Sequence, residues 1–163
     1  MAQATCWSTL APLRKVSFLS GTSRLVNHGI LSGDVTAQDG AGSDDDTING
    51  GGGSGDLTGF NGIDALTGGA GADTFHFLSS GVIGKTALHE TITDFPTGTD
   101  KIELGFMHGA NFIEGLGFSN TAGETRYVAA RGPLHGDVNG DGKADWILQL
   151  AHNLVVTADD LIP

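Results

Sequence analysis

The sequence predicts an all-β fold, in which a parallel β-roll of nonapeptide repeats is capped by antiparallel β-strands in a sandwich-like arrangement. Two observations predict it. Residues 41 to 76 divide into four consecutive nine-residue units, and residues 77 to 163 contain short segments in which apolar and polar residues alternate. A fixed nonapeptide period is typical of parallel β-helices, and alternation with period two is typical of half-buried strands.

The four units are AGSDDDTIN, GGGGSGDLT, GFNGIDALT and GGAGADTFH. Against the pattern G-G-x-G-x-D-x-U-x, where U is a large apolar residue, they match three, four, four and five of the five specified positions without an insertion. The apolar position is held by Ile48, Leu57, Leu66 and Phe75. The acidic position is held by Asp46, Asp64 and Asp73, and Gly55 stands in its place in the second unit.

Each half of a unit has its own physical task. Glycines allow positive φ angles and close approach of backbone carbonyls, and the x-U-x piece forms a strand with one inward side chain. Two units therefore make one coil, so that residues 41–46 stack on 59–64 and residues 50–55 stack on 68–73. Carboxylate and carbonyl oxygens between stacked loops suit a hard cation with flexible geometry, which favours calcium over magnesium.

The predicted calcium ligands share one location, the loops between the short strands. They are Asp44, Asp46, Gly51, Gly53, Gly59, Gly62, Asp64, Gly69, Gly71 and Asp73. We expect the side with Gly55 to bind calcium more weakly, because Asp56 lies one position out of register. A Gly/Asp-rich run can also be a flexible linker, but the fixed period argues against it. Without metal we expect disorder, since each half-coil buries only one apolar residue, and we expect folding on calcium binding.

Charge divides the chain into residues 1–33 and residues 34–163. The net charge is −11, and because Arg14, Lys15 and Arg24 lie in the acid-free first part, the second part carries −14. An acidic body argues against nucleic acid and anionic membrane as partners. The basic part resembles a transit-type peptide in composition or is a remnant that adds a strand, and its role stays open.

Targeting and redox signals are sparse. No apolar run reaches the ~18 residues of a membrane span, and the first 33 residues lack the apolar core of a cleaved secretory signal. Cys6 is the single cysteine, so a disulfide framework is excluded. We expect a monomer that neither inserts into a membrane nor uses a cleaved N-terminal signal.

Beyond the repeats, the sequence predicts cap strands, because a stack of coils with an open end would invite association. The predicted strands are residues 90–95, 100–104, 125–129, 144–150 and 154–157.

Four stretches of this region, in this order, are TITDFPTGTDKIEL, AGETRY, DVNGDGKADW and TADDLI. Together with the repeats, they resemble the C-terminal calcium-binding RTX (β-roll) domain of serralysin-type secreted metalloproteases over about residues 41 to 163. The resemblance implies a right-handed calcium β-roll, an extracellular location and export by type I secretion machinery. It also implies that Asp94 and Asp100 complete terminal calcium sites, although both also suit turns. Pro163 departs from the family's typical apolar ending.

Residues 137 to 145 carry a second candidate calcium site. Asp137, Asn139, Asp141 and Asp145 occupy EF-hand ligand positions, but Leu148 stands where the bidentate Glu is needed. Asn-Gly and Asp-Gly also form hairpin turns, so a turn between cap strands is an equal reading of the stretch.

No catalytic motif is present in the sequence, so we expect no enzyme activity from this chain alone. His89-Glu90 is followed by Thr93 where a zinc protease motif H-E-x-x-H needs its second histidine, and no G-x-S-x-G is found. Three functions stay open. They are a calcium-dependent folding and export module, a non-catalytic part of a zinc metalloprotease or another RTX enzyme such as an epimerase or lipase, and an adhesion or carbohydrate-binding module.

Overall fold

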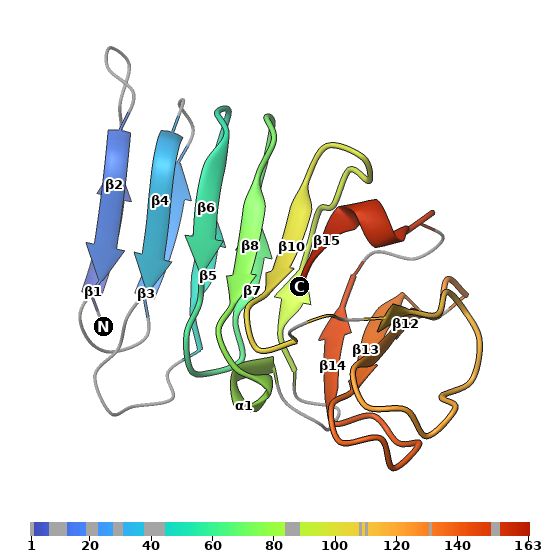
Figure 1. Cartoon of the computed structure of the whole chain (residues 1–163). Coiled ribbons are helices and arrows are strands. Elements are labelled where there is room, and N and C mark those ends of the chain that lie inside the picture. The colour runs from blue at the N-terminus through green and yellow to red at the C-terminus, as the bar shows by residue number, and fades with distance from the viewer. Residues whose placement is uncertain are drawn as a thin grey trace.

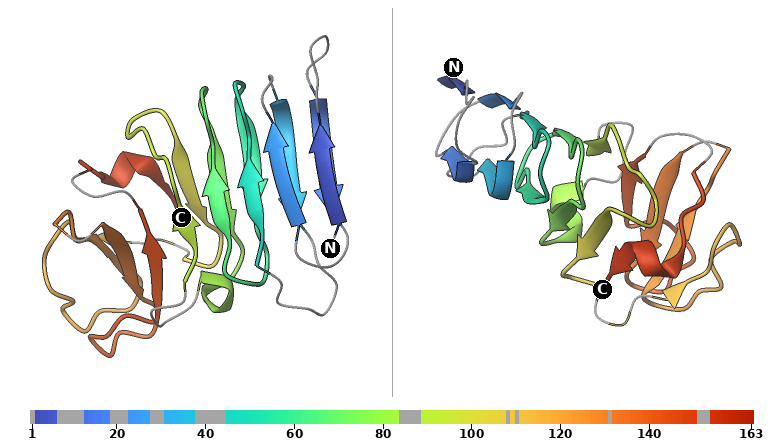
Figure 2. Two further views of the ribbon diagram at one scale, coloured as in Figure 1. Left: turned by 180° about the vertical axis from the view of Figure 1, so that it is seen from behind. Right: turned by 90° about the horizontal axis from the view of Figure 1, so that it is seen from above.

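The computed structural model describes residues 2–6, 13–18, 23–27, 31–37, 45–83, 89–107, 109, 111–130, 132–150 and 154–163. In this part of the chain, two β-sheets face each other across a narrow core (Figure 1). The view from above in Figure 2 shows the two layers of the roll and, at the far end from the N-terminus, the cap. The predicted all-β roll with a strand cap is confirmed.

The six-stranded sheet has the order β15-β10-β8-β6-β4-β2. Its strands are β2 (Leu13–Phe18), β4 (Leu31–Ala37), β6 (Gly55–Thr58), β8 (Thr74–Phe77), β10 (Lys101–Leu104) and β15 (Leu161–Ile162). The nine-stranded sheet has the order β1-β3-β5-β7-β9-β14-β13-β12-β11. Its strands are β1 (Ala2–Cys6), β3 (Ser23–Asn27), β5 (Thr47–Asn49), β7 (Ala65–Thr67), β9 (Thr91–Ile92), β11 (Asn111–Phe112), β12 (Glu124–Tyr127), β13 (Pro133–Asp137) and β14 (Trp146–Gln149).

The repeat units alternate between the two sheets, which confirms two units per coil. Strand β5 pairs in parallel with β7, with Ile48 opposite Leu66, and β6 pairs with β8, with Leu57 opposite Phe75. The register is therefore two units, and the apolar position of every unit faces the interior. Ile48 is 1% exposed, and Leu57, Leu66 and Phe75 are 0% exposed.

The core of the roll is thin and continues into the cap. Ile92 and Ile102 extend the apolar row beyond the repeats, and Trp146, Leu134 and Leu148 form the centre of the cap. Each fully buried side chain of this size contributes about 1.5–3 kcal/mol to folding. The coils alone bury few such groups, so the cap supplies much of the apolar core.

The N-terminal segment adds to the roll. Strand β3 pairs in parallel with β5, and β4 pairs in parallel with β6, while β1 and β2 lie outside them (Figure 1). Strand β4 spans the expected division between residues 33 and 34. The division into two parts and the role of residues 1–33 stay predictions.

The cap combines two pairing modes. Strands β12, β13 and β14 form an antiparallel meander, whereas β9–β14, β11–β12 and β10–β15 are parallel pairs. Helix α1 (Ser80–Ile83) and the 3-10 helix η1 (Ala158–Asp160) are short. No helix within the described ranges is long and apolar enough to cross a membrane.

One strand prediction for the cap is wrong, and strands β11, β13 and β15 were not predicted. Residues 154–157 are not in a strand, because the Leu154 N–H donates to the Tyr127 hydroxyl and the Thr157 N–H to the Asp160 carboxylate instead of a neighbouring strand. Strand β13 was not predicted, since Pro133 and Gly136 resemble turn residues. Gly136 is needed there, because a Cβ would lie 2.1 Å from the Trp146 ring.

Candidate metal centre

Carboxylates stack in a first column along one edge of the roll, formed by Asp46, Asp64 and Glu90. The Asp46 N–H donates to Asp64 Oδ1 at 2.8 Å, and the Asp64 N–H donates to Glu90 Oε2 at 2.9 Å. The three residues are 3%, 1% and 1% exposed, respectively. Each coil thus positions the carboxylate of the next coil under its own backbone.

A second column, formed by Gly55, Asp73 and Asp100, repeats this arrangement on the opposite edge. The Gly55 N–H donates to Asp73 Oδ1 at 2.8 Å, and the Asp73 N–H donates to Asp100 Oδ1 at 3.0 Å. Asp73 is 1% and Asp100 is 0% exposed. The structure therefore brings together the predicted Asp46 and Asp64 in one column, and Asp73 and Asp100 in the other.

Three of these carboxylates each have a buried oxygen atom that accepts no hydrogen bond from the described residues. Asp73 Oδ2, Glu90 Oε1 and Asp100 Oδ2 have no hydrogen-bond partner among the described residues. A buried polar oxygen without a partner costs about 1–3 kcal/mol, and more when it is charged. A cation with oxygen coordination would remove this cost at each of the three positions.

Glycines make room for the carboxylates. A Cβ at Gly59 would lie 2.1 Å from Asp64 Oδ2, and a Cβ at Gly68 would lie 2.7 Å from Asp73 Oδ2. Both carboxylates thus lie against the bare backbone of their own loop. The residues present fit a hard cation that combines carboxylate and carbonyl ligands.

The predicted loop glycines have two uses. Gly51, Gly62, Gly69 and Gly71 have positive φ angles of 92°, 131°, 93° and 128°. Gly69 and Gly71 also leave no room for a side chain. A Cβ at Gly69 would lie 1.9 Å from the Gly51 carbonyl oxygen, and a Cβ at Gly71 would lie 2.8 Å from the Gly53 backbone. Phe60 takes the corresponding place of a glycine in the third unit and has a φ of 65°. The loops of successive coils therefore stack in backbone contact.

The electrostatics of both columns show excess negative charge. Burial raises the pKa of Glu90 to about 9, and the charges of Asp64, Asp45 and Asp46 add to this against the hydrogen bond from the Asp64 N–H. Burial, together with the charges of Asp73 and Asp94, raises the pKa of Asp100 to about 6. The pKa of Asp73 is also raised, mainly by burial. In the folded chain, these groups require either a proton or a cation.

Asp94 lies beside the second column, where its charge acts on Asp73 and Asp100, and its hydrogen bonds differ from those of the column carboxylates. Its Oδ1 accepts the Gly68 N–H at 2.8 Å, and its Oδ2 accepts the Gly69 N–H at 2.9 Å. The carboxylate therefore closes the last glycine loop of the second column. Its part in a calcium site stays a prediction, and the predicted ligand Asp44 lies outside the described residues.

The loop between β13 and β14 contains the EF-hand-like residues. Asp137 accepts hydrogen bonds from the Gly140 and Gly142 N–H groups at 2.6 and 2.8 Å. Asp145 Oδ2 accepts the Val138 N–H at 2.9 Å, and Asn139 Oδ1 accepts the Asp141 N–H at 2.8 Å. These internal bonds are those of a hairpin turn, so the structure favours the turn, and metal binding by Asp137, Asn139, Asp141 and Asp145 stays a prediction.

Within the described ranges, side chains alone do not form a metal site. No group of three or more His, Cys, Asp or Glu side chains in the described part of the chain is arranged to hold a metal ion. The cause is geometric, since each coil supplies one inward carboxylate per edge. Cation sites in the columns would need backbone carbonyl oxygens for most of their ligands.

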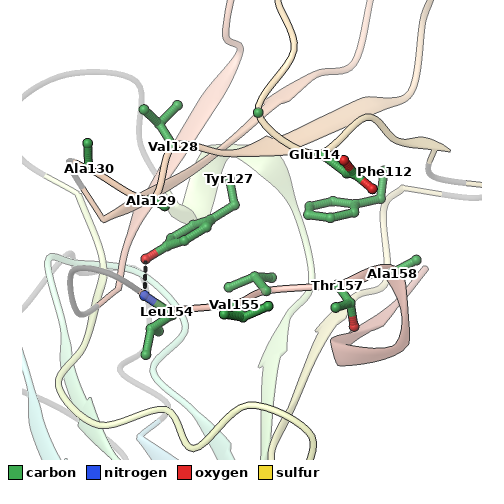
Figure 3. Close-up of a pocket in the computed structure, with 12 residues that line it drawn as sticks. Phe112, Glu114, Tyr127, Val128, Ala129, Ala130, Leu154, Val155, Thr157 and Ala158 are labelled. Atoms are coloured by element: carbon green, nitrogen blue, oxygen red, sulfur yellow. Dashed lines mark hydrogen bonds between the residues drawn. The ribbon is translucent and has the colours of Figure 1, made fainter.

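An apolar groove of about 680 Å³ lies in the cap, between β12 and the segment 154–158. Figure 3 shows Tyr127 and Phe112 on its walls, with the Tyr127 hydroxyl accepting the Leu154 N–H at 3.3 Å. Glu114 is the one titratable carboxylate among its lining residues.

Sequence reasoning missed Glu90 as a candidate ligand. The residue lies 26 positions after Asp64 and not 18, because helix α1 and the residues after it interrupt the period. The detectable signal was an acid directly before the apolar alternation of the segment 91–95. Because Glu90 follows His89, the pair His89-Glu90 instead resembles the start of the zinc motif H-E-x-x-H, which this sequence does not complete.

A parallel roll with stacked inward carboxylates and a strand cap defines a class of acidic, cation-compatible β-roll domains. The chain belongs to the family described as Peptidase M10 serralysin C terminal, whose model matches residues 16–162. This match confirms the resemblance to the serralysin C-terminal domain. The matched range begins at residue 16, inside the N-terminal segment. No curated protein matches the chain.

Proposed function

We propose that the chain is a calcium-binding module that folds on calcium binding, outside the cell, and supports export of a serralysin-like protein. One observation carries this proposal. In two columns, buried carboxylate oxygens of Asp73, Glu90 and Asp100 lie without a hydrogen-bond partner in the described structure, and Gly68 leaves room beside the free oxygen of Asp73. When bound, calcium would supply the positive charge that these oxygens lack.

The chain's own residues supply the geometry. The Asp64 N–H holds one oxygen of Glu90 and the Asp73 N–H holds one oxygen of Asp100, which leaves the other oxygen of each carboxylate for a ligand role. The carboxylates also repel one another without a cation. Folding and binding are therefore coupled, as in other small domains whose ligands repel in the apo state.

Calcium supply then decides where the chain folds. For sites with a Kd of about 10⁻⁴ M, within the range of extracellular modules, a ten-fold excess of calcium stabilises the fold by about 1.4 kcal/mol per site. At far lower calcium this contribution nearly vanishes. This supports a chain that is unfolded inside the cell and folded outside it, and we propose type I secretion machinery as its export partner.

We further propose that the module has no enzyme activity of its own. Family membership favours this, since the family is the C-terminal part of a peptidase. The second candidate function is therefore a non-catalytic part of a secreted zinc metalloprotease or another RTX enzyme. Casein hydrolysis by this chain, abolished by a zinc chelator, would contradict the assignment.

An adhesion or carbohydrate-binding role has less support. The outward positions of the repeat strands, such as Thr47, Ala65, Thr67 and Thr74, carry no aromatic platform for sugar stacking. Failure to bind a panel of polysaccharides would close this alternative.

A calcium titration tests the proposal directly. Calorimetry should show calcium binding with a much weaker response to magnesium. Asp64→Asn should weaken calcium binding more than Asp56→Asn, because Asp64 is buried in the first column. The Asp56 side chain is 52% exposed, and its Oδ1 lies 3.3 Å from His76 Nε2. Equal effects of the two substitutions would contradict the column geometry.

A further inference from the structure

The buried carboxylate of Asp160 ties the last turn of the described chain to the body of the roll. Asp160 is 1% exposed, and its Oδ1 accepts the Gly98 N–H at 2.7 Å. Its Oδ2 accepts the Thr157 N–H at 2.8 Å and the Thr157 hydroxyl at 3.1 Å. One side chain thus connects two turns that are 62 residues apart in sequence.

The first of these turns carries the last carboxylate of the second column. The N–H groups of Thr99 and Asp100 both donate to the Pro96 carbonyl at 3.1 Å, and Gly98, which directly precedes Thr99, has a φ of 80°. Asp100 follows directly and places its Oδ1 3.0 Å from the Asp73 nitrogen. The position of the Asp100 carboxylate therefore depends on how the turn 96–100 is held.

Two further contacts join the same two segments. Lys101 Nζ donates to the Asp159 carbonyl at 2.6 Å, while the Lys101 N–H donates to the Asp73 carbonyl at 2.8 Å. Strand β15 pairs in parallel with β10, with Leu161 opposite Ile102. The segment 157–162 is thus attached to the end of the second column. The first column ends separately, in Glu90, whose Oε2 is held by the Asp64 N–H.

We infer that Asp160 is a positioning residue for cation binding in the second column. By holding Gly98, it fixes the turn that aims Asp100 at Asp73. A cation bound in that column in turn stabilises the attachment of residues 157–162, because coupling between two sites is reciprocal. This inference rests on the calcium binding proposed above, and it concerns one column and not the other.

Backbone amides allow both columns to be followed in one sample. In a ¹⁵N NMR calcium titration, the Gly55 and Asp73 amides report the second column, and the Asp46 and Asp64 amides report the first. Asp160→Asn should raise the calcium concentration at half-saturation about five-fold for the second pair. The half-saturation concentration of the first pair should rise much less, and Asp159→Asn is the matched control, since the Asp159 side chain is exposed.

The outcomes separate this role from a merely structural one. Equal shifts of both pairs of amides, or no shift of either, would overturn the role of Asp160. A wild-type chain that shows no response to calcium would overturn the proposed function itself. If Asp160→Asn does not fold, hydrogen exchange of the wild type decides, because the Gly98 amide should gain protection together with Gly55 and not with Asp46.

Discussion

Glu90 Oε2 lies 2.9 Å from the Asp64 nitrogen, in the same relation that Asp64 Oδ1 has to the Asp46 nitrogen one coil earlier. The cap thus continues the carboxylate column after the repeats have ended. A glutamate replaces an aspartate at this step, and its longer side chain spans the change from regular coil to cap.

Replacing Glu90 by Gln tests this continuity. The amide keeps the size and one acceptor oxygen but removes the charge, so calcium affinity of the first column should fall about ten-fold, which corresponds to about 1.4 kcal/mol. Calorimetric titration measures the change. Glu114→Gln, which removes the charge of an exposed glutamate, is the control and should leave the titration unchanged.

Gly55→Asp should strengthen the second column. Gly55 occupies the place at which the other units carry an aspartate, and calcium affinity depends on the number of charged ligands. We expect calcium affinity to rise about ten-fold, or about 1.4 kcal/mol, while the calcium-free chain becomes less stable through repulsion by Asp73. The same charge at an open position, Gly117→Asp, should change neither quantity.

Gly59→Ala should displace the Asp64 carboxylate. The added methyl group would lie 2.1 Å from Asp64 Oδ2, a distance that a buried carboxylate in a stacked loop relieves only by moving. We expect a loss of about 1–3 kcal/mol in the free energy of unfolding with calcium, as for other overpacked sites. Thermal unfolding measures this, and Gly117→Ala, whose Cβ would contact nothing within 4 Å, should stay within about 0.5 kcal/mol of the wild type.

The stability of the calcium-free chain should fall as pH rises. Glu90 has a pKa raised from 4.5 to about 9, and Asp100 has a pKa raised from 3.8 to about 6. Between the ordinary and the raised pKa of each group, the folded chain binds a proton that the unfolded chain has lost. Each group therefore stabilises the fold below its ordinary pKa and ceases to do so above its raised pKa. Far-UV circular dichroism in calcium-stripped buffer tests the sign, because the folded fraction of the chain should be larger at pH 5 than at pH 8.5. Greater stability at pH 8.5 would contradict it.

Much of the roll could be predicted from the sequence, because the nonapeptide period fixes both the register and the inward position. Ile48 over Leu66 and Leu57 over Phe75 follow from the period alone. Asp64 and Asp73 follow as well, since each occupies the same place in its unit. The loop glycines with positive φ were likewise expected from their positions.

The end of the roll was harder to predict, since its contacts join residues without a common period. Glu90 meets Asp64 across 26 residues, and Asp160 meets Gly98 across 62 residues. Strand β13 was missed because Gly136 accommodates the Trp146 ring, a contact that only the folded cap reveals. Tertiary packing determines these contacts, and the local sequence pattern does not predict them.

Far-UV circular dichroism at neutral pH, with calcium in excess and with a chelator, tests the central claim most directly. The coils bury few apolar groups and stack carboxylates whose oxygens lack partners, so the fold should depend on the cation. We predict a β-rich spectrum in calcium and a largely disordered one in the chelator, reversibly. A spectrum that is already β-rich in the chelator, and unchanged by calcium, would contradict a calcium-dependent fold.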